Sequence, residues 1–161
     1  MTNIKIIISV ILLSIFGYAL AQSGGGMNHA QHHSAQTTDN RVAVDFPPAM
    51  REHILTNMRD HLLAISQIQE AMGKGNYDKA SKIAEDRLGM TSLKLHGAYE
   101  KSKYMPQGMK DIGTTLHKSA SQCAIEVQNS AVTGDLKPAL LALSKTTNAC
   151  VACHAGYKLK K

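Results

Sequence analysis

The spacing of apolar residues from Phe46 onward is helical throughout. A first helix is predicted over residues 47–72, where a proline pair suits the opening turn and glycines follow the end. Its apolar positions recur every three or four residues: Ile54, Leu55, Met58, Leu62, Ile65 and Ile68. A second helix is predicted to start at Asn76 or Asp78 and to end near Gly89.

Two further helices follow a less regular connection. Residues 90–106 contain interrupting Gly and Pro and are predicted to be only partly helical. The third helix is predicted over residues 107–132, with an apolar face of Met109, Ile112, Leu116, Ala120, Cys123 and Val127. The fourth starts near Leu136 and places on one inward face Leu136, Leu140, Leu143, Thr147, Cys150, His154 and Tyr157.

Four amphipathic helices with short links predict an all-α fold, an antiparallel four-helix bundle over residues 46–161. Only Val42 and Val44 alternate in the manner of a strand. The bundle has few aromatic residues, at 4% of the chain, and its predicted core is rich in Ala. A flat cofactor between the helices would fill such a core.

The N-terminal stretch is predicted to lie outside this domain. Residues 1–21 have the pattern of a cleavable signal peptide, with Lys5, an apolar run and a small-x-small end at Ala21. The apolar run is short for a membrane span, so we expect no stable membrane insertion after cleavage. Residues 22–45 read as a disordered polar leader. Its His29, His32 and His33 either bind a transition metal or belong to a plain tether.

The formal net charge of +6 favours acidic partners or simply supports solubility. No arginine-rich run with interleaved aromatic residues points to nucleic acid. No pair of carboxylates and no nucleophile–base arrangement points to an enzyme.

The chemistry is concentrated in the run Cys150-Val151-Ala152-Cys153-His154. C-x-x-C-H is the attachment pattern for a c-type haem. Two thiols three positions apart on a helix can each form a thioether to the porphyrin, and His154 then offers its imidazole to the iron. A thioredoxin-like pair would need a preceding strand, and a zinc site would need further ligands at recognisable spacing. One covalent haem c is therefore the predicted cofactor, and an export signal fits its attachment in the bacterial periplasm.

A helical bundle with this motif near its C-terminus resembles the class II cytochromes c, the cytochrome c′ family. The resemblance covers residues 46–158 and includes Tyr157 and Lys158 after the motif, although the family usually has Arg at the last position. It implies electron transfer between redox partner proteins, and by analogy a homodimer. Arg51 is similar to the family's propionate or pocket arginine; otherwise it is a surface side chain whose aliphatic part packs on the helix.

The family divides by the group opposite the axial histidine, and two residues compete for that place here. Leu55 matches the position at which an apolar side chain leaves the iron five-coordinate, so that it binds nitric oxide or carbon monoxide. Met58, one turn further, is the candidate sixth ligand of a low-spin electron carrier; otherwise it is a packing residue. The weaker candidates are Met50 and His61, and His53 is expected to face solvent.

Four other residues are candidates for positions near the haem. Lys158 is four residues after His154, so one helical turn places it beside the proximal face, where it steers a ligand or bonds a propionate; otherwise it is an exposed lysine. Tyr157 either stacks on the ring edge or packs in the core. We expect Cys123 to be a buried small hydrophobe and His117 to have no iron role.

Overall fold

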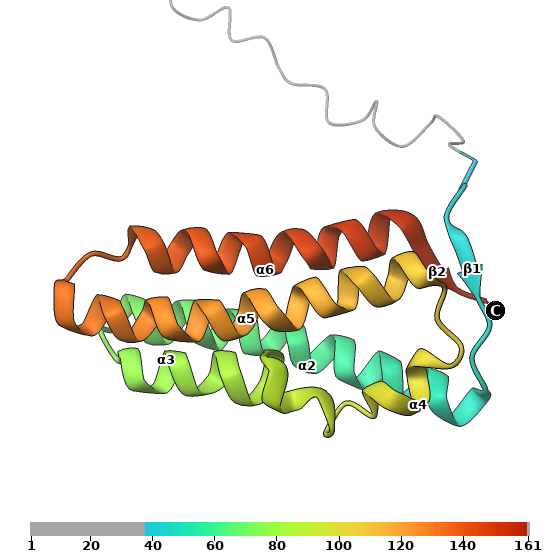
Figure 1. Cartoon of the computed structure of the whole chain (residues 1–161), viewed down its shortest axis with the longest axis horizontal. Coiled ribbons are helices and arrows are strands. Elements are labelled where there is room, and N and C mark those ends of the chain that lie inside the picture. Colours follow the sequence, from blue (N-terminus) through green and yellow to red (C-terminus); the bar gives the residue numbers. More distant parts are fainter. Residues whose placement is uncertain (1–37, 161) are drawn as a thin grey trace, which may run out of the picture. The chain divides into compact units, whose positions relative to one another are not determined.

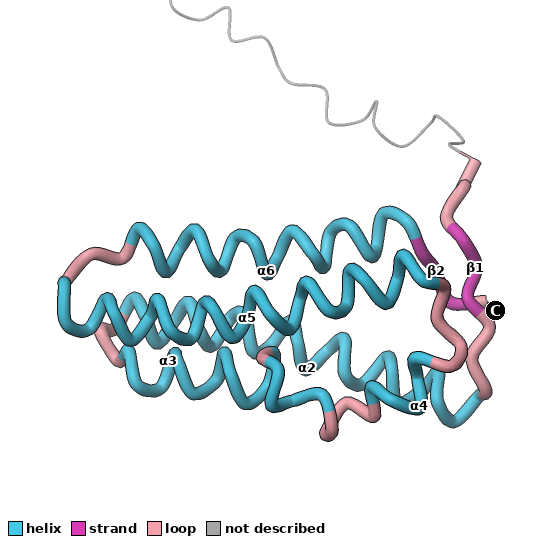
Figure 2. Tube along the Cα trace, in the orientation of Figure 1, coloured by secondary structure: helices cyan, strands magenta, loops and turns pink. Residues whose placement is uncertain are grey.

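The computed structural model describes residues 38–160, and these are mostly helical, which confirms the all-α prediction. The signal peptide and the three leader histidines lie outside the described residues. Figures 1 and 2 show the long helices side by side, with a short pair of strands at one end. The elements are β1 Val42–Val44, α2 Pro48–Gly73, α3 Tyr77–Ile83, η2 Ala84–Leu88, η3 Met90–Leu93, α4 Ala98–Ser102, α5 Gln107–Thr133, α6 Lys137–Gly156 and β2 Tyr157–Leu159.

The ends of the long helices follow local signals in the sequence. Proline stands in the first turn of both α2 and α6, where its missing N–H removes no helical hydrogen bond. After α2 and α5 the chain turns at Gly75 and Gly134, with φ values of 70° and 73°. Glycine adopts this left-handed conformation without steric penalty. The predicted bounds of α2 and α5 are confirmed to within one residue.

The second predicted helix is present, but its last turn is wider than an α-helix. The Asn76 side chain accepts a hydrogen bond from Lys79 N at 3.1 Å, which confirms Asn76 as the cap. From Ala84 the helix continues as the π-turn η2 and ends before Gly89. The connection then forms η3 and α4, as the partly helical pattern of residues 90–106 predicted.

The central packing is between α5 and α6. The two helices bury mainly small side chains against each other, among them Ala120, Cys123 and Ala124 of α5 and Ala139 and Ala142 of α6. α3 in turn packs against α5 and α2. α2 packs much less closely against α6 than α5 does.

The inward stripe predicted for α6 is only partly confirmed, because Leu143 is buried but Leu140 and His154 are exposed. The buried residues of this helix are Ala139, Ala142, Leu143, Thr146 and Ala149, whereas Leu140 is 53% exposed. Small side chains let α5 approach closely, so the alanine-rich face becomes the buried one. The predicted stripe had placed Leu140 on the inward face instead of these alanines.

The fourth predicted helix, α6, ends at Gly156, although its predicted stripe extended to Tyr157. After Gly156 the chain becomes extended, and β2 pairs in parallel with β1, with Ala43 opposite Lys158. β1 lies within the stretch that was predicted to be a leader, and its Val44 is only 4% exposed. The alternation of Val42 and Val44 was therefore a real strand signal. Among the described residues, no helix is both long and apolar enough to cross a membrane.

Candidate functional site

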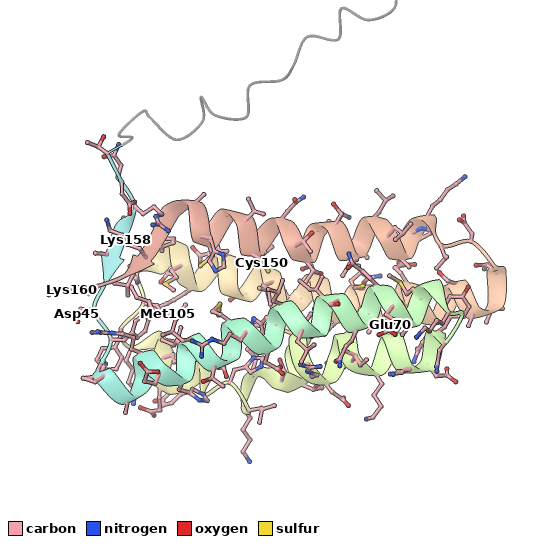
Figure 3. All side chains as sticks on the ribbon, turned by 180° about the vertical axis from the view of Figure 1, so that it is seen from behind. Asp45, Glu70, Met105, Cys150, Lys158 and Lys160 are labelled. Atoms are coloured by element: carbon pink, nitrogen blue, oxygen red, sulfur yellow. The ribbon has the colours of Figure 1, made fainter. Side chains whose placement is uncertain are left out.

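The C-x-x-C-H motif occupies the last two turns of α6. Cys150 and Cys153 are three positions apart, so they share one side of the helix, and both are half-buried. The Cys150 Sγ lies 3.6 Å from the backbone oxygen of Thr146. Figure 3 shows Cys150 toward the strand end of the molecule, far from Glu70 near the opposite end. The two thiols therefore lie on the same side of α6, at the edge of the buried core.

All three cysteines are free thiols, but their surroundings differ. Burial raises the pKa of Cys123 to about 11, because the apolar interior disfavours its thiolate. Burial also raises the pKa of Cys150 and Cys153, and the neighbouring Cys150 adds to the shift at Cys153. Cys123 is 1% exposed, which confirms that it is a buried small hydrophobe.

The helical pattern predicts His154 on the inward face of α6, but in the structure it is not there. Its side chain is exposed, because α6 turns its alanine face toward α5 and carries residue 154 to the outside. Its backbone oxygen accepts a hydrogen bond from Arg41 Nη1 at 3.4 Å. The imidazole is therefore at the surface, and the backbone of His154 contacts the segment that leads into β1.

Lys158 is not one helical turn beyond His154, because it lies on β2. Its Nζ is 3.2 Å from the Asp39 carboxylate, which is also paired with Arg41. These two basic partners hold the pKa of Asp39 far below its usual value, with the Arg41 hydrogen bond contributing most. Asp39 and Arg41 were missed from the sequence because they lie in the expected leader. They tie this segment to the chain just after the motif.

The predicted face of α2 is rotated relative to the buried one. The buried residues are Ile54, Asn57, His61, Ala64, Ile68, Ala71 and Met72. Of the predicted apolar positions, Ile54 and Ile68 are buried, whereas Leu55 is half-buried and Met58 and Leu62 are 36% and 71% exposed. Hydrophobic spacing alone could not separate two adjacent apolar stripes on one helix.

Arg51 carries an unsatisfied polar atom. Its Nη2 lies 3.5 Å from the backbone oxygen of Phe46, and its Nε is buried without a partner. A buried N–H that lacks an acceptor is unfavourable by about 1–3 kcal/mol. An anionic group beside α2 would satisfy this guanidinium.

A methionine-rich cluster closes the end of the molecule beside the motif. Val44, Phe46 and Ile54 are buried there, and five partly buried residues pack on them: Met50, Met105, Met109, Tyr157 and Leu159. Figure 3 shows Met105 at the same end as Cys150. The Tyr157 hydroxyl approaches α5 so closely that a Cβ at Gly108 would lie 2.6 Å from it. Tyr157 is thus a packing residue of this cluster in the structure.

A second group of titratable residues lies deeper in the fold and was not predicted as a cluster. His61 on α2, His96 between η3 and α4, and His117 on α5 bring their rings together. The sequence pattern points to His61 and His117 only as separate residues and gives no signal for His96. Because the three are far apart in the chain, no spacing rule could have joined them.

Comparison with protein-family models, curated proteins and solved structures finds no match to this chain. The C-x-x-C-H motif, its position on α6 and the side chains around it are therefore the features of the molecule that point to a function.

Proposed function

We propose that this protein is an exported monohaem c-type cytochrome that transfers electrons through a His154-ligated iron. The observation that carries the proposal is the placement of Cys150 and Cys153 on one side of the last turns of α6, with His154 next in the chain and accessible. In this proposal α2, α3 with η2, α5 and α6 form an antiparallel four-helix bundle around the haem. A haem c supplies reversible one-electron oxidation and reduction of its iron.

Four features of the chain fit such a group. The orphaned Nε of Arg51 is a donor suited to a propionate. The two thiols are half-buried, so they are accessible for a covalent bond to a porphyrin that would at the same time cover the apolar surface around them. The methionine-rich cluster offers flexible, polarisable side chains that adapt to a large flat ring. The loose packing between α2 and α6 is consistent with an additional group between these helices.

A second candidate function rests on Leu55. This side chain is half-buried on the same α2 face as Arg51 and Met58. If Leu55 covers the iron, the protein binds nitric oxide or carbon monoxide at a five-coordinate haem. If the Met58 thioether reaches the iron, the site is closed and the protein is a simple electron carrier.

Haem attachment is tested by producing the full chain in an exporting host that carries the haem-attachment system. We expect an alkaline pyridine spectrum of a c-type haem and a mass increase of one haem. Cys150→Ala and Cys153→Ala should each lose one thioether bond, while the matched control Cys123→Ala keeps both. Colourless mature protein with three titratable thiols would refute the proposal.

The state of the iron is tested by the visible spectrum of the reduced protein with and without carbon monoxide. A low-spin spectrum that carbon monoxide leaves unchanged supports a sixth protein ligand. In that case Met58→Ala should create a response to carbon monoxide. A large change in the unmodified protein supports the Leu55 alternative, and Leu55→Met should then suppress it.

A further inference from the structure

The histidine triad, defined as His61, His96 and His117, joins three separate parts of the chain. The ring centroids of His61 and His96 are 4.7 Å apart, those of His96 and His117 5.5 Å, and those of His61 and His117 6.4 Å. His61 is 7% exposed and His96 3% exposed, and His117 is half-buried. Asn57 Nδ2 donates to the His96 backbone oxygen at 3.4 Å and so holds the connecting loop against α2.

The hydrogen bonds of two of these rings fix which nitrogen carries the proton. His117 Nδ1 lies 2.8 Å from the backbone oxygen of Leu88, so it is protonated and donates. Ser92 donates its own hydroxyl proton to the Gly89 oxygen at 2.7 Å. At 3.4 Å, His96 Nδ1 must therefore be the donor to Ser92 Oγ. In the neutral rings this leaves both Nε2 atoms with a free lone pair.

The third ring adds an unexplained polar atom. His61 Nε2 is buried and has no hydrogen-bond partner. Burial, together with repulsion from the other two rings, lowers the pKa of His61 to about 4. Burial and repulsion likewise lower the pKa of His96 to about 4, and burial lowers that of His117. The triad is thus neutral at physiological pH, the form in which imidazole binds metals.

Two of the three ring separations suit a shared metal ion. Zinc–nitrogen bonds are about 2.0–2.1 Å long, which places the centres of three imidazoles bound through Nε2 about 5 Å from one another. The His61–His96 and His96–His117 separations are close to this value, whereas the His61–His117 separation of 6.4 Å exceeds it. As the side chains stand in the part of the chain that the structure describes, no group of three or more His, Cys, Asp or Glu residues could hold a metal ion. Metal binding therefore requires a shift of the His61 ring, whose Nε2 has no hydrogen bond to lose, while His96 and His117 keep theirs.

We propose that His61, His96 and His117 bind one divalent first-row transition metal ion through three Nε2 atoms, with water in the fourth position. The contacts of His117 with Leu88 O and of His96 with Ser92 Oγ match the second-shell bonds that orient metal-binding histidines. Imidazole donors suit zinc, copper and nickel. This site shares no residue with the haem motif, so it stands or falls independently of haem attachment.

Two charged residues near the triad have opposite effects on the pKa values of its histidines. Lys101 of α4 is half-buried, and its charge lowers the pKa of all three histidines, so it also disfavours a bound cation. Asp60 of α2 acts in the opposite sense on His61 and His96, although it is paired with Arg87. Lys101→Met should therefore tighten metal binding several-fold.

The test is calorimetric titration of the mature, haem-loaded protein with Zn²⁺ at pH 7.5, after removal of bound metal. The leader is a competing site, so His29, His32 and His33 are first replaced by Asn. We expect one zinc ion per chain, and at least a tenfold loss of affinity in each of His61→Gln, His96→Gln and His117→Gln. Glu52→Gln is the control, because Glu52 lies on α2 and is exposed, whereas His53 Nε2 contacts the His96 backbone oxygen at 3.3 Å. The affinity of this control should be unchanged.

X-ray absorption of the zinc-loaded protein keeps the proposal testable if a triad variant misfolds. We expect three imidazole donors and one oxygen around the metal. The absence of stoichiometric zinc binding in the leader variant would overturn the proposal. Binding that the triad substitutions leave unchanged, or a zinc ion with sulfur ligands, would also overturn it.

Discussion

Lowering the pH from 8 to 5 should destabilise the metal-free protein, because two buried histidines resist protonation in the native state. Burial, followed by repulsion between neighbouring rings, lowers the pKa of His61 and His96 from 6.5 to about 4. Well above pH 6.5, His61 and His96 are neutral in both the native and the unfolded state, so they make no pH-dependent contribution to stability there. Between pH 6.5 and 4 the unfolded chain binds protons that the native protein does not, so the free energy of unfolding falls as the pH falls.

The magnitude follows from these pKa values. At pH 5 each histidine lowers the free energy of unfolding by about 2 kcal/mol relative to pH 8. The two shifts include repulsion from the same neighbours, so the pair contributes about 2–4 kcal/mol together. Among the facing groups, Lys101 strengthens the effect and Asp60 weakens it. The carboxylates with lowered pKa, including Asp60, lose their stabilising contribution at lower pH, below this window.

The assay is urea unfolding followed by circular dichroism at several pH values from 8 to 5, with EDTA present so that no metal occupies the triad. We expect the unfolding midpoint to fall steadily below pH 6.5 at a constant slope with urea. The double variant His61→Gln/His96→Gln should lose most of this pH dependence, even if it is less stable at pH 8. The exposed Glu52→Gln should keep it. Equal stability at pH 8 and pH 5 in the unmodified protein would refute the reasoning.

Three further predictions concern packing and can be measured by the same unfolding assay. Gly108→Ala should destabilise the protein by about 1 kcal/mol, because the new Cβ would lie 2.6 Å from the Tyr157 hydroxyl. Tyr157→Phe should relieve this contact, so purely additive effects in the double variant would contradict the prediction. Arg87→Met should lower the free energy of unfolding by about 1–2 kcal/mol, because this 22% exposed side chain donates to a carboxylate and a backbone oxygen of α2; an unchanged midpoint would argue against it. Ile68→Ala, at 0% exposure, should be destabilising by about 2–5 kcal/mol, whereas Leu63→Ala, at 52% exposure, should change little.

The sequence by itself determined the helical elements and the position of the motif. Helix ends are local events, set by proline in a first turn, by an Asn76 cap or by glycine at positive φ, so residues next to each other in the chain suffice to predict them. The spacing of Cys150 and Cys153 likewise fixes that both thiols share one side of a helix.

Only the tertiary structure decided which face of each helix is buried. On α6 the close approach of α5 selects the alanine stripe and leaves His154 exposed, although the larger apolar residues had suggested another face. The parallel pairing of β1 with β2 joins two ends of the chain and removes Lys158 from the helix that the sequence predicted. The histidine triad arises in the same way, from His61, His96 and His117 on three separate segments. Burial and proximity between distant residues depend on how whole elements pack, and the period of a single helix carries no information about its partners.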